Sequence, residues 1–396
     1  MVDCGAVPSL VLLLASHSAN VREQSAWCLG NIAGDGAELR DHVLQSGALH
    51  PLLQNVLQPA SLSMLRNCVW ALSNFCRGKP QPALPTVAAA VPVLAQIMMQ
   101  HEDKEVQMDA CWAMSYLSDG DNERVELVHQ TGIIGRLAEL LAHESPSVVT
   151  PALRTVGNIV SGDDKQTQAA VDAGCIPAVL PLLVHTKKGI RKEACWMLSN
   201  IAAGNKDQIT SLLQQREVVD GVLGQLAADE WDVRKEAAWV LSNVATGGMH
   251  EQIFALVKNH ACVAPLCGLL DVRDAKILQV ALDALEAMLK CDQKSSGLLQ
   301  VPAMVDEADG LDKLEALQEH ENQVVYEKAV RLIETYFGSD EDEGGENIAP
   351  ASDGVTFAFG LPPKHLGEGS NVFSATTLEL NTNAFNANSF KFNVAT

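Results

Sequence analysis

The segment Ala194–Gly204 reads ACWMLSNIAAG, and Ala237–Gly247 reads AAWVLSNVATG. Both place an asparagine four residues after a tryptophan, among apolar residues at helical spacing. When the whole chain is aligned on this motif, its first position recurs every 42 or 43 residues. The recurring residues are Trp27, Trp70, Trp112, Arg154, Trp196, Trp239 and Leu282. The sequence therefore repeats one structural unit.

A second recurring segment lies upstream of each motif, for example GAVPSLVLLL from Gly5 and GCIPAVLPLL from Gly174. Eight copies of it can be counted, the last after a longer insertion. Each copy has apolar residues at helical spacing and Gly, Pro, Asp or Asn at its joints. A period of about 40 to 47 residues with two or three helices is typical of armadillo and HEAT repeats. We predict an all-α, right-handed superhelical solenoid of armadillo repeats over residues 1–337, about eight repeats with the first incomplete.

The two ends of the chain differ from its middle. No first helix precedes GAVPSLVLLL, so an apolar edge is expected to be open there. At the other end, Gly338–Glu346 reads GSDEDEGGE, and a Gly-, Asn-, Ser- and Thr-rich segment follows to Thr396. We predict that residues 338–396 form an acidic and then low-complexity disordered tail.

Composition argues against several classes of protein. A net charge of −21 disfavours nucleic-acid binding, because phosphates demand a surplus of Lys and Arg. No apolar run reaches the roughly 18 residues of a membrane span, and the first residues lack the basic region of a signal peptide. The ten cysteines form no CxxC pair, so we predict free core thiols in a reducing compartment. No GxSxG, P-loop or HExxH motif occurs, and we predict no enzyme, no cofactor and no metal.

The repeated tryptophan and asparagine share a helix face, because they lie four residues apart. In one interpretation the tryptophans are core and the asparagines satisfy loop backbone. In the other, the asparagine amides bond the backbone of an extended peptide, and the indoles hold the stems of its Lys or Arg side chains. Packed helices lie about 8–10 Å apart, so each repeat would meet about three peptide residues. We favour this second interpretation because a core ladder does not require an amide in every repeat.

Carboxylates accompany the ladder. Asp109, Glu193 and Glu236 lie three residues before a ladder position, and no basic residue occupies an equivalent place. The loops after the ladder helices carry further carboxylates: Asp35, Asp119, Asp121, Asp163 and Asp164. An acidic rim favours a Lys- and Arg-rich peptide. It argues against the alternative, an armadillo scaffold of the beta-catenin kind in signalling or adhesion, whose groove is basic.

Several segments resemble successive armadillo repeats of importin alpha, the adaptor that carries basic nuclear localisation signals to importin beta. They are QSAWCLGNIAGDG, CVWALSNFCRGKP, ACWAMSYLSDGDNERV, TPALRTVGNIVSGDDKQTQ and KEAAWVLSNVATGG. The resemblance runs from about Val2 to Phe337. It includes two irregularities, Tyr116 in place of the third ladder asparagine and Arg154 in place of the fourth tryptophan. It implies a nuclear import adaptor that shuttles between cytoplasm and nucleus and binds basic cargo peptides in a concave groove.

The resemblance also implies two peptide-binding sites. The minor site is expected to be complete, with Val160, Gly162, Asp164, Thr167, Glu193, Trp196, Asn200, Glu236, Trp239 and Asn243. The major site is expected to contain Trp27, Asn31, Asp35, Trp70, Asn74, Arg77, Asp109, Trp112 and Tyr116. Its principal lysine pocket also uses a Gly/Thr loop of a preceding repeat, which has no counterpart here. We therefore expect weaker binding at the major site.

Two further partners are implied by the resemblance. The basic N-terminal segment with which the family binds importin beta has no counterpart in the sequence, so binding to importin beta is not expected. The last repeat, which begins DGLDKLEALQ at Asp309, resembles the region that contacts the export receptor. That contact is expected to be retained.

Overall fold

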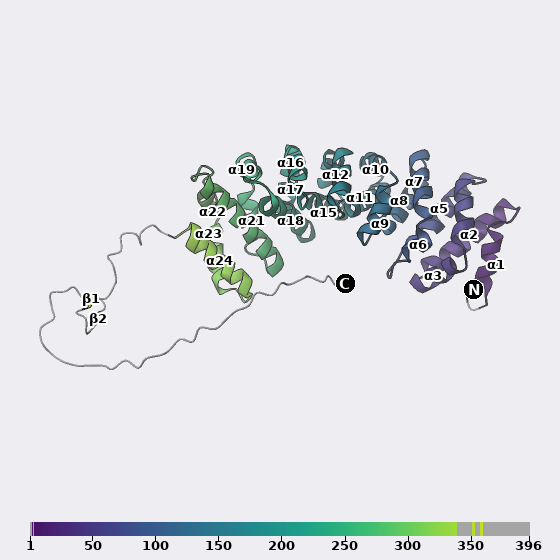
Figure 1. Cartoon of the computed structure of the whole chain (residues 1–396), viewed down its shortest axis with the longest axis horizontal. Helices are drawn as coiled ribbons and strands as arrows, with labels where there is room; N and C mark the ends of the chain where they lie inside the picture. The colour runs from purple at the N-terminus through teal and green to yellow at the C-terminus, as the bar shows by residue number, and fades with distance from the viewer. Residues whose placement is uncertain (1, 3, 339–350, 353–356, 359–396) are drawn as a thin grey trace. The chain divides into compact units, whose positions relative to one another are not determined.

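The computed structural model describes residue 2, residues 4–338 and the pairs 351–352 and 357–358. The chain divides into two units, Met1–Gly338 and Ser339–Thr396. The first unit is a row of helices that begins with α1 and ends with α24 (Figure 1). Within the described residues of this unit, all regular secondary structure is helical. This confirms the predicted all-α fold.

Most repeats consist of three helices. The first helices are short: α3 (Ala37–Gln45), α6 (Leu84–Val87), α9 (Asn122–His129), α12 (Asp164–Asp172), α16 (Lys206–Leu213), α19 (His250–Asn259) and α22 (Val301–Glu307). The second helices are α1 (Ala6–Leu13), α4 (Leu49–Leu57), α7 (Ala90–Gln100), α10 (Ile134–Leu141), α13 (Cys175–Ala178) with α14 (Leu180–Leu183), α17 (Arg216–Ala228), α20 (Val263–Cys267) and α23 (Gly310–Ala316), which the 3₁₀ helix η1 (Leu317–Glu319) follows.

We call the third helix of each repeat the ladder helix, because in the first seven repeats it carries the Trp-x-x-x-Asn motif or its equivalent. The ladder helices are α2 (Ala19–Gly34), α5 (Leu62–Cys76), α8 (Lys104–Ser118), α11 (Pro146–Ile159), α15 (Lys188–Ala202), α18 (Trp231–Gly247), α21 (Ala275–Lys294) and α24 (Gln323–Tyr336). Residues 4–338 thus contain eight ladder helices, which agrees with the eight copies counted in the sequence.

Polar side chains set the starts of several helices. Asp103 precedes α8 and accepts a backbone N–H of its first turn. Asp163 and Gln166 form a capping box at α12, and Asn205 and Gln208 form the same arrangement one repeat later at α16. Each cap satisfies backbone N–H groups that the helix itself leaves unpaired. The Asp and Asn residues at the joints of the repeat therefore act as helix starts.

Neighbouring repeats pack through their ladder helices. Along the row α2 packs on α5, α5 on α8, and so on to α21 on α24. Each ladder helix also packs on the second helix of its own repeat, for example α5 on α4 and α18 on α17. The buried apolar residues form one core that runs through the unit. Because each repeat buries its apolar face only against its neighbours, the stability of the unit is shared between adjacent repeats.

Eight cysteines are free and buried in this core, as predicted: Cys68, Cys76, Cys111, Cys175, Cys195, Cys262, Cys267 and Cys291. Burial raises the pKa of the Cys76 and Cys111 thiols to about 12. These thiols therefore stay protonated and unreactive at neutral pH. In the described part of the chain, no helix is long and apolar enough to cross a membrane.

The described residues of the second unit form one short antiparallel pair. Strand β1 (Ala351–Ser352) pairs with β2 (Phe357–Ala358), with Ala351 opposite Ala358 and Ser352 opposite Phe357. The rest of the predicted disordered tail lies outside the described residues, so its disorder stays a prediction.

Candidate functional site

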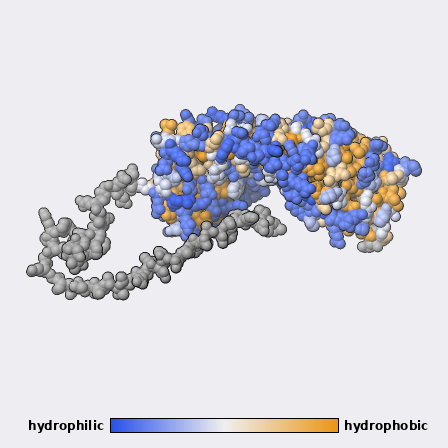
Figure 2. Space-filling model, in the orientation of Figure 1, coloured by the Kyte–Doolittle hydropathy of each residue, from blue (hydrophilic) through white to orange (hydrophobic). Residues whose placement is uncertain are grey.

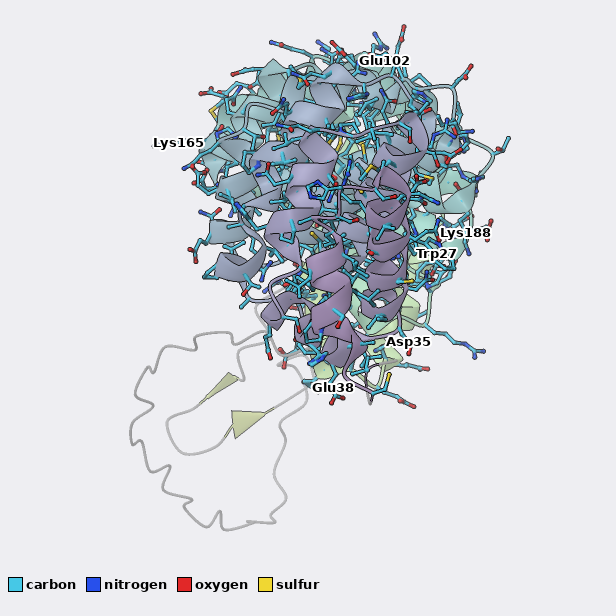
Figure 3. The ribbon with its side chains drawn as sticks, turned by 90° about the vertical axis from the view of Figure 1, so that its right-hand side faces the viewer. Trp27, Asp35, Glu38, Glu102, Lys165 and Lys188 are labelled. Atoms are coloured by element: carbon cyan, nitrogen blue, oxygen red, sulfur yellow. The ribbon has the colours of Figure 1, made fainter. Side chains whose placement is uncertain are left out.

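The Trp and Asn positions of the ladder helices form a surface that we call the ladder face. The Trp27 side chain is 49% exposed on it, and the tryptophans of the later repeats are half-buried. In the view along the row, Trp27 and Asp35 lie on the same side of the unit, and Lys165 projects from the opposite side (Figure 3). The surface in Figure 2 is mostly hydrophilic, with larger hydrophobic areas toward the end that holds α1 to α5.

The indoles lean against the ladder helix of the preceding repeat. A Cβ atom on Gly30 would lie 2.7 Å from Cζ3 of Trp70, and one on Gly157 would lie 2.2 Å from Cζ3 of Trp196. Both distances are too short for a real contact, so the lack of a side chain lets each indole lie directly on a helix backbone. The sequence pattern gives no sign of this role, because nothing local distinguishes these glycines from other helical glycines.

The ladder asparagines tie adjacent repeats together. The Nδ2 atom of Asn74 donates to the carbonyl of Gly30 at 3.2 Å, that of Asn200 to the carbonyl of Gly157 at 3.4 Å, and that of Asn243 to the equivalent carbonyl of α15 at 2.9 Å. Each acceptor immediately precedes the ladder asparagine of the previous repeat. The premise that the ladder needs no amide is therefore wrong. One N–H and the Oδ1 atom of each amide are left over from these bonds.

Two ladder positions, Asn31 and Tyr116, form no bond to the preceding ladder helix among the described residues. Asn31, on the first ladder helix, is exposed, and its amide donates to the carbonyl of Trp27 in its own helix at 2.9 Å. Tyr116, in place of the third asparagine, stacks on Trp112 with ring centroids 5.7 Å apart. The aromatic surface of the major site therefore continues at the position where the amide is absent.

Two cations of the chain itself lie over minor-site tryptophans. The guanidinium carbon of Arg154 is 5.4 Å from the centroid of the Trp196 ring, and the guanidinium forms an ion pair with Glu193. The Nζ atom of Lys276 is 5.5 Å from the centroid of the Trp239 ring. An indole face beside a carboxylate thus holds a cation within this chain.

Carboxylates at the minor site are partly withdrawn from water. Burial raises the pKa of the Glu236 carboxyl, and the nearby Glu193 charge acts in the same direction. The Oε2 atom of Glu193 is buried and has no hydrogen-bond partner among the described residues. A buried acceptor without a donor destabilises the protein, so a cationic ligand that bonded this oxygen would be favoured.

The predicted lysine pocket of the minor site lies around the N-terminus of α12. The Thr167 hydroxyl is buried and donates to the Val160 carbonyl at 3.2 Å, which leaves the hydroxyl oxygen as an acceptor. Asp164 is exposed, and its carboxylate accepts from the Asn205 amide at 3.3 Å. Gly162 lies in the same turn, at the start of α12. The structure therefore brings these residues together, and the described residues that bond Thr167 and Asp164 include no cation.

A buried arginine supports the loop that carries Arg77 of the major site. Arg40, on α3, has a fully buried side chain. Its guanidinium donates to the carbonyl of Arg77 at 2.7 Å and to that of Pro80 at 2.8 Å. Asp41 supplies its ion pair at 2.8 Å. This clamp fixes where α5 ends, and sequence analysis did not identify it.

Comparison with known proteins agrees with this arrangement. A model of the armadillo/beta-catenin-like repeat matches residues 1–34, 36–77, 80–119, 121–161 and 163–203, and a model of the atypical Arm repeat matches residues 300–351. Among solved structures, an engineered protein is similar to this chain with a TM-score of 0.68 and 26% identity. The match covers 85% of this chain and 90% of the engineered protein. A designed armadillo repeat protein in complex with the peptide (KR)4 covers 62% of this chain and 99% of its own, with a TM-score of 0.55 and 29% identity.

Two curated relatives decide the family. Importin subunit alpha-1b of Oryza sativa subsp. japonica is 48% identical over 367 residues, which cover 91% of this chain and 68% of that protein. Importin subunit alpha-2 of Arabidopsis thaliana is 49% identical over 373 residues, 92% of this chain and 69% of that protein. This chain belongs to the importin alpha family. The family consists of armadillo-repeat adaptors of nuclear import and not of enzymes, as the sequence predicted.

One carboxyl of the major site in this importin alpha chain is strongly perturbed. Asp109, on α8, is 8% exposed. Burial raises its pKa to about 6, and the nearby Glu105 charge adds to the shift. The folded state thus binds the Asp109 proton more tightly than the unfolded state does. The stability that this proton confers is present below about pH 4 and is lost as the pH rises through about 6.

Replacing Asp109 with asparagine is therefore expected to raise the free energy of unfolding by about 2 kcal/mol at pH 7, and much less at pH 4. Urea titrations at the two pH values measure the difference. The exposed Asp172→Asn variant, on α12, is the control and should change stability at neither pH. Equal stabilisation by Asp109→Asn at both pH values would contradict the assigned desolvation.

Proposed function

We propose that this importin alpha chain binds Lys- and Arg-rich nuclear localisation signals as extended peptides along its ladder face. The observation that carries the proposal is Arg154, whose guanidinium lies over the Trp196 ring and pairs with Glu193. The chain's own arginine thereby shows the kind of contact that a cargo arginine or lysine would make at neighbouring indoles. The net charge of −21 favours the approach of such peptides.

The spacing of the ladder supports an extended peptide. Ladder helices that pack at about 8–10 Å match about three residues of an extended chain. The amides of Asn200 and Asn243 keep one N–H and one oxygen each, which suits the backbone of such a peptide. A designed armadillo protein has been solved with a peptide of alternating Lys and Arg, (KR)4, which is the kind of ligand proposed here.

We assign the larger share of the binding to the minor site. Its carboxylates Glu193 and Glu236 are both partly buried, and one Glu193 oxygen has no partner among the described residues. At the major site, Asp35, the carboxylate of the expected lysine pocket, is exposed. A buried carboxylate gains more from a cation than an exposed one does, because water screens the exposed charge.

The test is a fluorescence-polarisation titration of the chain with a labelled peptide that carries two basic clusters. An acidic peptide of equal length is the control, and both are run at low and moderate salt. Binding of the basic peptide alone, weakened by salt, is the expected result because the contacts are largely between charges. Failure of the folded, monomeric chain to bind the basic peptide, or equal binding of both peptides, would overturn the proposal.

The partner and localisation predictions extend this proposal. We infer that the last repeat, with α23 and α24, contacts the export receptor, and that the chain shuttles between cytoplasm and nucleus. We also propose that residues 1–396 do not bind importin beta. Pull-down of each purified receptor with the chain, and imaging of a fluorescent fusion with and without an export block, test the three separately.

A further inference from the structure

Lys276 has an unusual place on the ladder face. It is the second residue of α21 in the seventh repeat, and its Nζ atom lies 5.5 Å from the centroid of the Trp239 ring on α18. The Lys276 side chain is exposed, and its ammonium forms no ion pair with any residue of the described segment 4–338. The sequence pattern does not predict this contact, because Lys276 lies six residues before Leu282, the ladder position of its own helix.

Lys276 and Arg154 cover the minor-site tryptophans from opposite ends. Arg154 belongs to α11, which packs on one side of α15, and Lys276 belongs to α21, which packs on the far side of α18. Trp196 on α15 and Trp239 on α18 lie between them. The indole faces that point away from each other are therefore each covered by a cation of the chain. If basic side chains insert between neighbouring indoles, as the proposed function assumes, the minor site offers one such slot, between Trp196 and Trp239.

The major site is different in this respect. No Lys or Arg within the described residues lies over the ring of Trp27, Trp70 or Trp112. Three uncovered indoles in successive repeats leave two consecutive slots, where the minor site has one. The two sites therefore differ in the number of basic side chains that they can take in a row.

We propose that Lys276 determines the specificity of the minor site by closing the slot beyond Trp239. One basic side chain of a peptide fits between Trp196 and Trp239. A second basic side chain, one repeat farther along toward α21, would need an open face of Trp239 and meets the Lys276 ammonium there instead. This inference rests on the proposed function, because it assumes that basic peptides occupy the ladder face. It adds a residue that limits the length of the basic cluster read there.

The experiment compares three peptides on four proteins. The first peptide has a single lysine for the minor site, and the other two carry an extra arginine about three residues before or after it, which is one repeat spacing. Both directions are included because either end of the peptide could point toward α21. The proteins are the unmodified chain, Lys276→Ala, Lys276→Arg and Lys290→Ala. Affinities are measured by fluorescence polarisation.

For each peptide, the affinity of Lys276→Ala is divided by that of the unmodified chain. We expect this ratio to be about two- to fivefold larger for one of the two-cation peptides than for the single-lysine peptide. Lys276→Arg keeps a cation over the ring and should leave the slot closed. Lys290→Ala is the matched control. It removes the same charge from the same helix, 14 residues and thus about 21 Å farther along α21, so it should affect all three peptides equally.

Each outcome separates the inference from the proposal beneath it. If the single-lysine peptide binds the unmodified chain but Lys276→Ala improves all three peptides equally, the role of Lys276 is refuted and the proposed function survives. The same conclusion follows if Lys290→Ala reproduces the selective gain, because general charge would then explain it. If no basic peptide binds any of the proteins, the proposed function fails and the inference fails with it.

Discussion

Replacing Asn200 and Asn243 together with alanine is expected to weaken the binding of a lysine-rich peptide by about 30- to 150-fold. Each amide would lose its hydrogen bonds to the peptide backbone, at about 1–1.5 kcal/mol for each residue. Each would also lose the bond that ties its repeat to the carbonyl of the preceding ladder helix. The free energy of unfolding should therefore fall as well, by about 1 kcal/mol for each asparagine.

The two effects can be separated with a control on the same ladder. Asn31 bonds only within its own helix, so Asn31→Ala should leave thermal stability unchanged and weaken peptide binding less than the double variant does. Peptide titration is run at a temperature at which circular dichroism shows every variant to be folded. Undiminished binding by the folded double variant would refute the backbone-bonding role. Equal losses from the minor pair and from Asn31 with Asn74 would refute the larger share assigned to the minor site.

Replacing Arg40 with methionine is expected to have the largest effect on stability, a loss of about 3 kcal/mol. Methionine keeps much of the side-chain volume but removes the buried guanidinium that donates to the carbonyls of Arg77 and Pro80. The four hydrogen bonds that the Arg40 guanidinium donates, each worth about 1 kcal/mol, would be lost together, and this loss exceeds what a surface ion pair contributes. The loss should appear in the first repeats before the last ones, because repeats unfold in local groups.

Urea titration followed by circular dichroism measures the total effect, and hydrogen exchange of the loop after α5 measures the local one. The control is Arg216→Met. Arg216 is 71% exposed, and within residues 4–338 its contacts are a hydrogen bond of 3.3 Å to the Asn259 carbonyl and an ion pair of 3.9 Å with Asp220. It should lose less than about 0.5 kcal/mol. Equal losses in the two variants would show that the Arg40 clamp does not stabilise the fold.

The sequence was enough to predict which residues share the ladder face, and their binding of a peptide stays a prediction. Trp196 with Asn200 and Trp239 with Asn243 recur at helical spacing, so one helix face must carry all four, and stacking must align them. The acidic residues Glu193 and Glu236 share that face for the same reason. What the structure corrected is the role of the asparagines, whose amides bond the preceding ladder helix and so stabilise the stack.

The sequence by itself determined the repeat period, the helical class and the ladder register, because helical periodicity and capping depend on residues within a few positions of each other. Only the tertiary structure decided which backbone the asparagine amides bond, what Arg40 clamps and which indole Lys276 covers. Those contacts join residues about 40 positions apart, for example Asn200 with Gly157. They depend on how closely neighbouring helices approach and which rotamer a long side chain adopts, and neither quantity is encoded in a local pattern.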